Sequence, residues 1–391
     1  MSKKIAYIGE FKFPKGDAAS VRVLGVGQIL AECGFEVTFH GTTMEKDKYS
    51  VEPEGTYKGF KYSNLFLKNG NILKRISNRF FAGYRLTKIM DTDKPDYIIV
   101  AGGYSRYLVP VLIYARKNNI KVIVDVVEWF DYSHLPGGKY GLFALDVHLA
   151  LTKFMKKSDG IIAISSFLES YYKKSNLPAI RVPIVIDSSD SKWYIKGESF
   201  DPESLNLVYA GVPGKKDWIA IAIYGINELI KEGHCNIKLH LIGPTENDIK
   251  ALLDENVISL EALRQNILFY GRTDQEKVPA LLSKADFSVL IRPNERYANA
   301  GFPTKFVESL AIGLPVIANL TSDLEMYLKD GENGFIISDN SIEAFKNSLR
   351  KALLLTDSEK IEMKKNAKLT AREFFEYQSY IGDMNTFVQK I

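Results

Sequence analysis

Apolar residues along the chain gather in short runs, and longer amphipathic stretches separate these runs. Short runs rich in β-branched residues, bounded by glycine or polar turns, are typical of strands buried on both faces. Such runs occupy residues 5–8, 36–40, 95–100, 120–127, 158–165, 181–187, 205–211, 237–243, 266–271, 287–291 and 315–318. Because helical spacing fills most of the intervals, we predict an α/β fold with doubly wound parallel sheets.

The length of 391 residues suggests two or three domains of ordinary size. Residues 5–40 read as a βαβ unit, with Gly34 just past the expected helix. Residues 188–204 are polar and irregular, as expected of a linker. We therefore predict a first Rossmann-like domain over 1–195 and a second over 205–360, followed by a C-terminal helical segment over 361–391.

Composition narrows the class of protein. With 46% hydrophobic and 25% charged residues, the chain has the composition of a soluble globular protein. Cys33 and Cys235 stand far apart without a CxxC or CxxH pattern, which argues against a disulfide or a metal site and fits a reducing compartment. The sequence shows no signal-peptide pattern and no long apolar span, so we expect a cytoplasmic location.

Charge is distributed unevenly behind a net charge of +4. Residues 1–200 carry 29 basic and 20 acidic residues, whereas the remainder carries 22 and 27, which indicates different partners for the two halves. No Arg-rich recognition helix or aromatic-basic RNA signature is present, so we expect no nucleic-acid partner.

Residues 61–90 contain seven basic residues and no acidic residue. Ile72, Ile76, Phe80 and Tyr84 recur at helical spacing, so the stretch includes an amphipathic helix. One interpretation is a Rossmann helix with a solvated basic face. The other is a patch attracted to an anionic membrane surface, which would place the protein peripherally on the inner face of the cell membrane.

The segment 292–318 is the most informative part of the chain. A strand is expected to end before Arg292, and a loop follows as far as Phe302. Pro303 suits the first turn of a helix that ends at Gly313, and another strand follows. The loop and the helix N-terminus therefore lie at the carboxyl end of a strand, where open α/β sheets bind ligands.

Three residue types in this segment suit an anionic ligand that also carries hydroxyl groups. Gly301 permits close backbone approach, and Lys305 adds a positive charge to the helix N-terminus, so both could hold a diphosphate. Glu308 lies four residues after Thr304, and a carboxylate there suits the hydroxyls of a ribose. The alternative is an ordinary αβ crossover with a surface lysine and glutamate.

This segment resembles the nucleotide-sugar site of glycosyltransferase family 4, whose members are retaining enzymes with the two-domain GT-B fold. The family pattern is close to G-[FP]-P-x-K-x-x-E-[AS]-x-A-x-G-x-P-V-[IV]. It aligns with Gly301, Phe302, Pro303, Thr304, Lys305, Glu308, Ser309, Ala311, Gly313, Pro315, Val316 and Ile317. The resemblance is strong over 205–335 and diffuse before it. It implies that residues 301–305 and Glu308 bind the donor.

One departure affects the sugar contact. The family usually places a second glutamate eight residues before the helix glutamate, and here that position is Ala300. Glu295 or Asn299 could substitute, and we retain Asn299 as a donor-binding candidate.

The resemblance implies further donor contacts. Gly16 matches a glycine that lies against the donor phosphates and sugar, although the alternative is a simple turn; no GxGxxG pattern surrounds it. Gly211 begins an element whose lysine neutralises the diphosphate, and Lys216 fits that lysine best, with Lys215 beside it. Val212 stands where an arginine often accompanies the lysine, so Arg292 could supply the missing charge. Arg272 follows the turn that holds the nucleotide base in the family.

The strand expected at 120–127 runs into a segment rich in carboxylates and aromatic rings, followed by His134. By position in GT-B enzymes, Glu128 and Trp129 are candidates for acceptor binding, and His134 is a catalytic candidate near the donor sugar. Flat rings stack on sugar C–H groups, and carboxylates bind hydroxyls. The alternative is that Trp129 belongs to the core and His134 to a loop.

The resemblance implies transfer of a sugar from a nucleoside-diphosphate sugar to a glycan or lipid-linked acceptor, with retention of the anomeric configuration. Lys216 and Lys305 would stabilise the leaving group. No DxD-type metal site is evident, so we expect no metal and no cofactor besides the donor substrate. The resemblance to the family also implies that the C-terminal helix returns to the first domain. Two alternatives are a GT-B nucleotide-sugar epimerase and a non-catalytic binder of nucleotide sugars.

Overall fold

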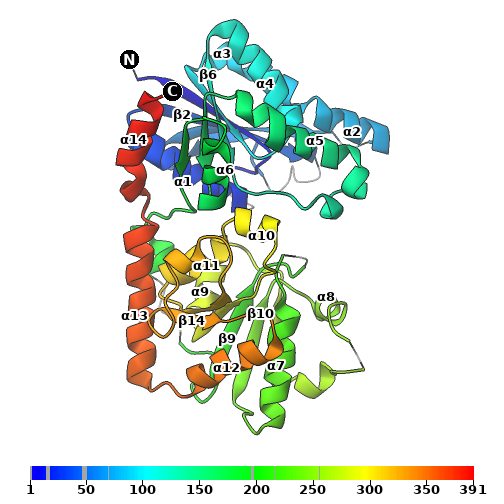
Figure 1. Cartoon of the computed structure of the whole chain (residues 1–391), viewed down its shortest axis with the longest axis vertical. Coiled ribbons are helices and arrows are strands. Elements are labelled where there is room, and N and C mark those ends of the chain that lie inside the picture. Colours follow the sequence, from blue (N-terminus) through cyan, green and yellow to red (C-terminus); the bar gives the residue numbers. More distant parts are fainter. Residues whose placement is uncertain are drawn as a thin grey trace. The chain divides into compact units, whose positions relative to one another are not determined.

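The computed structural model describes residues 2–14, 18–45, 51–68, 70–194, 198–214, 216–254 and 256–391. It divides into two units (Figure 1). The first unit contains residues 1–185, 299–302 and 377–391, and the second contains residues 186–298 and 303–376. Gly16 and Lys215, both named above, lie outside the described residues.

The first unit is built on an eight-stranded sheet with the order β3-β4-β2-β1-β5-β6-β7-β8. Its strands are β1 (Lys4–Gly9), β2 (Glu36–Met44), β3 (Glu54–Tyr57), β4 (Phe60–Leu67), β5 (Tyr97–Ala101), β6 (Lys121–Val126), β7 (Gly160–Ala163) and β8 (Ala179–Arg181). Every pairing is parallel except β3 with β4. The strand order reverses direction between β1 and β5, which makes their carboxyl ends a topological switch point.

Helices connect the parallel strands of this sheet. They are α1 (Ala18–Glu32), α2 (Ile72–Phe80), α3 (Ala82–Asp93), α4 (Ser105–Asn118), α5 (Leu142–Leu149) and α6 (Ser166–Lys173). Between β6 and β7 the chain also forms the short helical turns η2 (Tyr132–His134), η3 (Gly138–Tyr140), η4 (Ala150–Phe154) and η5 (Met155–Lys157). None of the helices in the described ranges has the length and hydrophobicity needed to cross a bilayer.

The C-terminal segment completes the first unit. The helix α14 (Ile381–Gln389) lies beside α1 (Figure 1). Met384, Phe387 and Val388 are buried in the same hydrophobic cluster as Ile5, Ile29 and other residues of the first unit. Burial of these side chains, rather than helix propensity over nine residues, is what fixes such a short helix in place.

The second unit has a six-stranded, wholly parallel sheet with the order β11-β10-β9-β12-β13-β14. Its strands are β9 (Leu205–Ala210), β10 (Ile237–Ile242), β11 (Ile267–Gly271), β12 (Phe287–Leu290), β13 (Val316–Asn319) and β14 (Gly334–Ile337). The chain runs outward from β9 to β11 and then outward in the other direction from β12 to β14. The carboxyl ends of β9 and β12 therefore form the switch point of this sheet.

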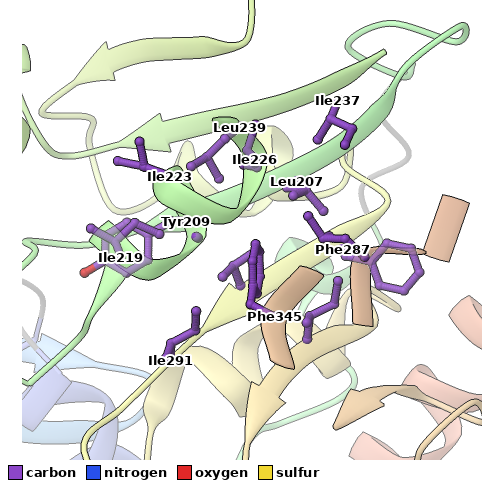
Figure 2. Packing of buried hydrophobic residues seen from close by; sticks show 14 of the residues in the cluster. Leu207, Tyr209, Ile219, Ile223, Ile226, Ile237, Leu239, Phe287, Ile291 and Phe345 are labelled. Carbon is purple, nitrogen blue, oxygen red and sulfur yellow. The ribbon is translucent and has the colours of Figure 1, made fainter. Parts of the chain in front are cut away.

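Alternate side chains of β9 enter two separate hydrophobic clusters, because successive side chains of a strand point to opposite faces. Leu207 and Tyr209 pack in a cluster with Ile223 of α7 (Ile219–Lys231) and Phe345 of α12 (Ile342–Leu353), as Figure 2 shows. Val208 packs with Leu282 of α9 (Val278–Leu282) in the other cluster. Both faces of the second sheet are thus covered by helices, as the continuous apolar runs predict.

The remaining helices of the second unit are α8 (Glu246–Lys250), α10 (Arg296–Ala300), α11 (Thr304–Ala311) and α13 (Asp357–Phe374), and the 3-10 turns are η6 (Ser191–Trp193), η7 (Glu261–Leu263) and η8 (Leu324–Met326). Residues 299 and 300 of α10 are grouped with the first unit. The 3-10 turn η9 (Tyr377–Tyr380) precedes α14. The second unit therefore extends to Glu376, and only residues 377–391 return to the first unit.

Several local expectations differ from the structure. The basic stretch 61–90 begins inside β4, and its helical part is split into α2 and α3, which meet at Phe81. The strand expected at 181–187 is confined to β8, which ends at Arg181. The loop expected after Arg292 contains α10. The segment expected to be an irregular linker contains η6, in which Trp193 is buried.

Candidate functional site

Two strand ends and one helix start meet at the switch point of the second sheet. Gly211 follows β9, and Arg292 follows β12 by two residues. Thr304 begins α11, so Lys305 stands in its first turn. Parallel strands place their carboxyl ends at one edge of the sheet, which is why residues separated by more than 90 positions gather here.

Asp217 lies at the centre of this group. Its Oδ2 accepts a hydrogen bond from the ammonium of Lys305 and another, 2.9 Å long, from the hydroxyl of Tyr209. The Nε of Arg292 is 3.9 Å from its Oδ1. Lys305 Nζ also donates to Tyr209 Oη over 3.0 Å and sits 4.2 Å from the centre of that ring. Asp217 and Tyr209 together therefore fix the position of the Lys305 ammonium.

The protonation states at this group follow from burial and charge. Burial would raise the pKa of the Asp217 carboxyl, but Lys305 and Arg292 more than offset that effect and hold its pKa below the ordinary value. Burial and the adjacent Asp217 raise the pKa of the Tyr209 phenol, so Tyr209 is neutral at physiological pH. Two cations, Lys305 and Arg292, thus lie beside the carboxylate of Asp217, and Lys305 stands in the first turn of α11.

Gly211 is required by the approach of Lys305. Its φ is +145°, and an added Cβ would lie 2.5 Å from Lys305 Nζ and 2.6 Å from Cε. Any side chain at this position would displace the ammonium from Asp217. The glycine therefore keeps open the space that Lys305 occupies.

Two other residues predicted to bind the donor substrate, Lys216 and Arg272, are exposed. Lys216 is exposed on the loop before α7, next to Asp217. Arg272 is exposed after β11. The pKa of Asp248 is lowered mainly by hydrogen bonds from Thr245 and, to a smaller extent, by the charge of Arg272. Neither residue is shown in contact with Lys305, so their donor roles stay predictions.

The residues around α11 differ in exposure. Phe302 and Pro303 are buried, as is Gly301, whereas Thr304 is partly exposed. Burial of the Glu308 carboxyl raises its pKa, although Lys192 and Lys305 act in the opposite direction. A carboxyl group at this position can accept hydrogen bonds from the hydroxyls of a ligand.

Ala300 stands where the resembled family carries its second glutamate, and its side chain is fully buried. Asn299, the expected substitute, is partly exposed, and residues 299–302 are grouped with the first unit. The role of Asn299 in donor binding stays a prediction.

A second charged group occupies the switch point of the first sheet. Glu10 directly follows β1, and its Oε2 accepts a 2.6 Å hydrogen bond from Nη2 of Arg106, at the start of α4. The buried Arg106 also pairs with Asp146 of α5 at 2.5 Å. Its guanidinium stacks over the ring of Tyr104 at 3.8 Å. One cation thus holds a partly exposed carboxylate at the edge where an open sheet binds ligands.

Tyr104 links this group to one of the predicted acceptor residues. Burial raises the pKa of its phenol, and the charges of Glu10 and Glu128 raise it further. Glu128 is partly exposed in the loop after β6. Two carboxylates and an aromatic ring at one sheet edge have the chemistry expected of a sugar-binding site.

Trp129 and His134 have different surroundings. The indole of Trp129 is buried and packs edge-on against Tyr171 at 4.9 Å and against Phe167 at 6.4 Å. This position matches the core alternative, although its acceptor role is untested. His134 ends η2, with Nε2 3.3 Å from Asp131 Oδ2. Its catalytic role stays a prediction.

Sequence reasoning missed Asp217, Glu10 and Arg106. Asp217 follows two lysines and reads as part of a solvated helix start, and only the fold places it against Lys305. Glu10 could have been found, because it directly follows a predicted strand at the edge that binds ligands. Among the described residues, no cluster of three or more His, Cys, Asp or Glu side chains has the arrangement of a metal site.

Comparison with solved structures defines the fold class. The chain aligns with sucrose-phosphate synthase from Thermosynechococcus elongatus at a TM-score of 0.75 and 14% identity, covering 99% of this chain and 98% of that one. It aligns with Anabaena HepE in complex with UDP-glucose at a TM-score of 0.68 and 13% identity, covering 99% and 100%. The chain has the GT-B fold, which confirms the predicted architecture.

The sequence comparisons narrow the class of protein further. Residues 218–370 match the family model of "Glycosyl transferases group 1". A 41.2 kDa uncharacterized protein from the cps region of Klebsiella pneumoniae is 22% identical over 357 residues, 88% of this chain and 92% of that one. An uncharacterized glycosyltransferase of Methanocaldococcus jannaschii is 24% identical over 243 residues, 60% of this chain and 59% of that one. Together the comparisons support a glycosyltransferase of the GT-B type.

Proposed function

We propose that the protein transfers a sugar from a nucleoside-diphosphate sugar to a glycan or lipid-linked acceptor, with retention of the anomeric configuration. The observation that carries this proposal is the ammonium of Lys305, which Asp217 and Tyr209 hold in the first turn of α11, at the switch point of the second sheet. A UDP-sugar complex of the GT-B neighbour HepE supports a nucleotide sugar as the ligand.

Lys305 is suited to stabilise a diphosphate leaving group. The ammonium of Lys305 has three N–H donors, and it donates to Asp217 Oδ2 and to Tyr209 Oη. The third donor and the N-terminus of α11 would meet the phosphate oxygens on which charge develops as the glycosidic bond to the diphosphate breaks. Such positioning costs no reorganisation during the reaction, and the proposal requires no cofactor besides the donor.

The acceptor would bind at the switch point of the first sheet. Glu10 and Glu128 offer carboxylates to acceptor hydroxyls, and Tyr104 offers a ring. Arg106 holds Glu10 in place through a 2.6 Å hydrogen bond. Selection of the acceptor would depend on these few polar contacts, because each buried polar group left unpaired by a wrong acceptor is costly.

The proposal is tested by incubating the purified protein with a panel of nucleotide sugars, alone and with glycan or lipid-linked acceptors. We expect release of a nucleoside diphosphate that depends on the acceptor, and a product whose anomeric configuration, read by NMR coupling constants, matches the donor. A sugar altered in the absence of acceptor would instead identify an epimerase. Binding without release of diphosphate under any acceptor would identify a non-catalytic binder.

A further inference from the structure

The helix α5 is apolar on a face that it does not bury. Its sequence is LFALDVHL, and Ala144, Asp146 and Val147 are buried in the first unit. Leu142 and Leu145, three residues apart on the outer face, remain 62% and 54% exposed, and Tyr140 just before the helix is 95% exposed. A surface helix normally presents polar residues outward, so this face points to a partner.

The exposed apolar surface continues onto α2 and α3. The ring of Phe80, at the end of α2, lies 6.3 Å from the ring of Phe143 in α5. Arg79 stacks on the same Phe143 ring at 5.9 Å. Phe81 and Tyr84, at the junction of α2 and α3, are each more than half exposed. Figure 1 shows α2 and α5 beside each other in the first unit. We refer to the five exposed residues Phe81, Tyr84, Tyr140, Leu142 and Leu145 as the α2–α5 surface.

Basic side chains outnumber acidic ones on the segments that carry the α2–α5 surface. Residues 61–90 contain seven basic residues and no acid. Residues 138–157 contain four lysines and one acid, Asp146, which is buried against Arg106. Lys74, Lys88, Lys139 and Lys153 are exposed. The surroundings of the apolar residues are therefore predominantly basic, and the exposed acid on these helices, Asp91, lies near the C-terminal end of α3.

We propose that the α2–α5 surface docks onto an anionic lipid bilayer. Exposed tyrosines and leucines suit the boundary between headgroups and acyl chains, and lysines beside them suit lipid phosphates. Leucines and a phenylalanine offer no hydrogen-bonding groups to an acidic protein partner, so a lipid surface suits these residues better. This inference goes beyond the proposed function, because docking requires neither the nucleotide sugar nor Lys305.

The experiment is cosedimentation of the full chain with vesicles of phosphatidylcholine, with and without phosphatidylglycerol. We expect binding to the anionic vesicles and little binding to the neutral ones, with the difference decreasing as salt rises. The double substitution Leu142→Ser with Leu145→Ser should weaken binding at least about tenfold, because two leucines no longer enter the lipid. Charge reversal of Lys74 and Lys139 to Glu should weaken it by a similar factor of about ten or more.

A matched control uses the exposed apolar residues of the second unit. Leu354→Ser with Ile361→Ser removes residues that are 83% and 67% exposed, and vesicle binding should be unchanged. Binding of UDP and the circular dichroism spectrum report whether each variant is folded. The inference is overturned if the native chain binds both vesicle types equally or neither. It is also overturned if the leucine variant binds as the native chain does, or loses self-association instead of vesicle binding.

Discussion

The pairing of Lys305 with Asp217 makes a quantitative prediction for Lys305→Met. The side chains of Lys305 and Asp217 are 29% and 13% exposed. Removing one member of a fully buried ion pair costs about 3–5 kcal/mol, whereas an exposed pair contributes about 0–1 kcal/mol. The partial exposure places the cost between these limits, at about 2 kcal/mol. For a unit of this size, that corresponds to a decrease in Tm of about 4–8 °C.

The same substitution should weaken nucleotide binding for a separate reason. A hydrogen bond from an ammonium to a phosphate contributes about 1.5–3 kcal/mol. Lys305→Met should therefore raise the Kd for UDP by about 10–150-fold, as measured by isothermal titration calorimetry. Lys351→Met is the matched control, because it removes an exposed lysine paired with Asp330 in the same unit. Lys351→Met should change the Tm by at most a few degrees and should leave the Kd for UDP unchanged.

The double variant Lys305→Met with Asp217→Asn separates the two effects. Asparagine at position 217 removes the carboxylate that Lys305→Met leaves buried without its main partner, so most of the lost stability should return. The affinity for UDP should not return, because the ammonium is still missing. The reasoning is refuted if Lys305→Met leaves UDP affinity and turnover unchanged. A double variant that recovers UDP affinity together with stability would refute it equally.

Three further predictions address other parts of the molecule. Burial, and to a lesser extent the charge of Lys238, lowers the pKa of His240 to about 4. The neutral imidazole therefore contributes fully to the free energy of unfolding above the unfolded-state pKa of about 6.5, and this contribution is lost as the pH falls toward 4. Urea titrations should show a loss of about 2–3 kcal/mol over that interval, and His240→Gln should flatten it. Gly211→Ala should displace Lys305 and weaken UDP binding, whereas Gly214→Ala, on the same loop with open space at its Cβ, should not. Glu10→Gln should raise the acceptor KM by roughly tenfold while leaving the donor KM unchanged. An unchanged acceptor KM would contradict this role and would indicate that the carboxylate serves only to pair with Arg106.

Much of the fold could be predicted because parallel strands buried on both faces have continuous apolar sequences. The strand at 316–319 and the helix ending before Gly313 were visible from residue types alone. By contrast, β14 is not among the predicted strands, because its apolar run is short and begins at a glycine, Gly334. The break between α2 and α3 was missed since Phe81 is apolar and gives no sign of a helix end.

The candidate site was predictable only in part. The motif around Lys305 was recognisable, because its glycines and prolines are spaced by the turn and helix that they form. Its partner Asp217 was not, because pairing across 88 residues depends on sheet order, which local sequence does not encode. Likewise, Arg106 reads as an ordinary helix residue, and only its burial between Glu10 and Asp146 distinguishes it.

The grouping of residues 377–391 with the first 185 residues has a consequence for biosynthesis. Met384 and Phe387 fill the core around α1, so the first unit lacks part of its interior until residues 377–391 have been synthesised. The intervening unit, by contrast, has all its strands in one continuous stretch and can fold while the tail is still being made. Premature termination near residue 376 would leave an apolar gap in the N-terminal portion, which predisposes such fragments to capture by chaperones.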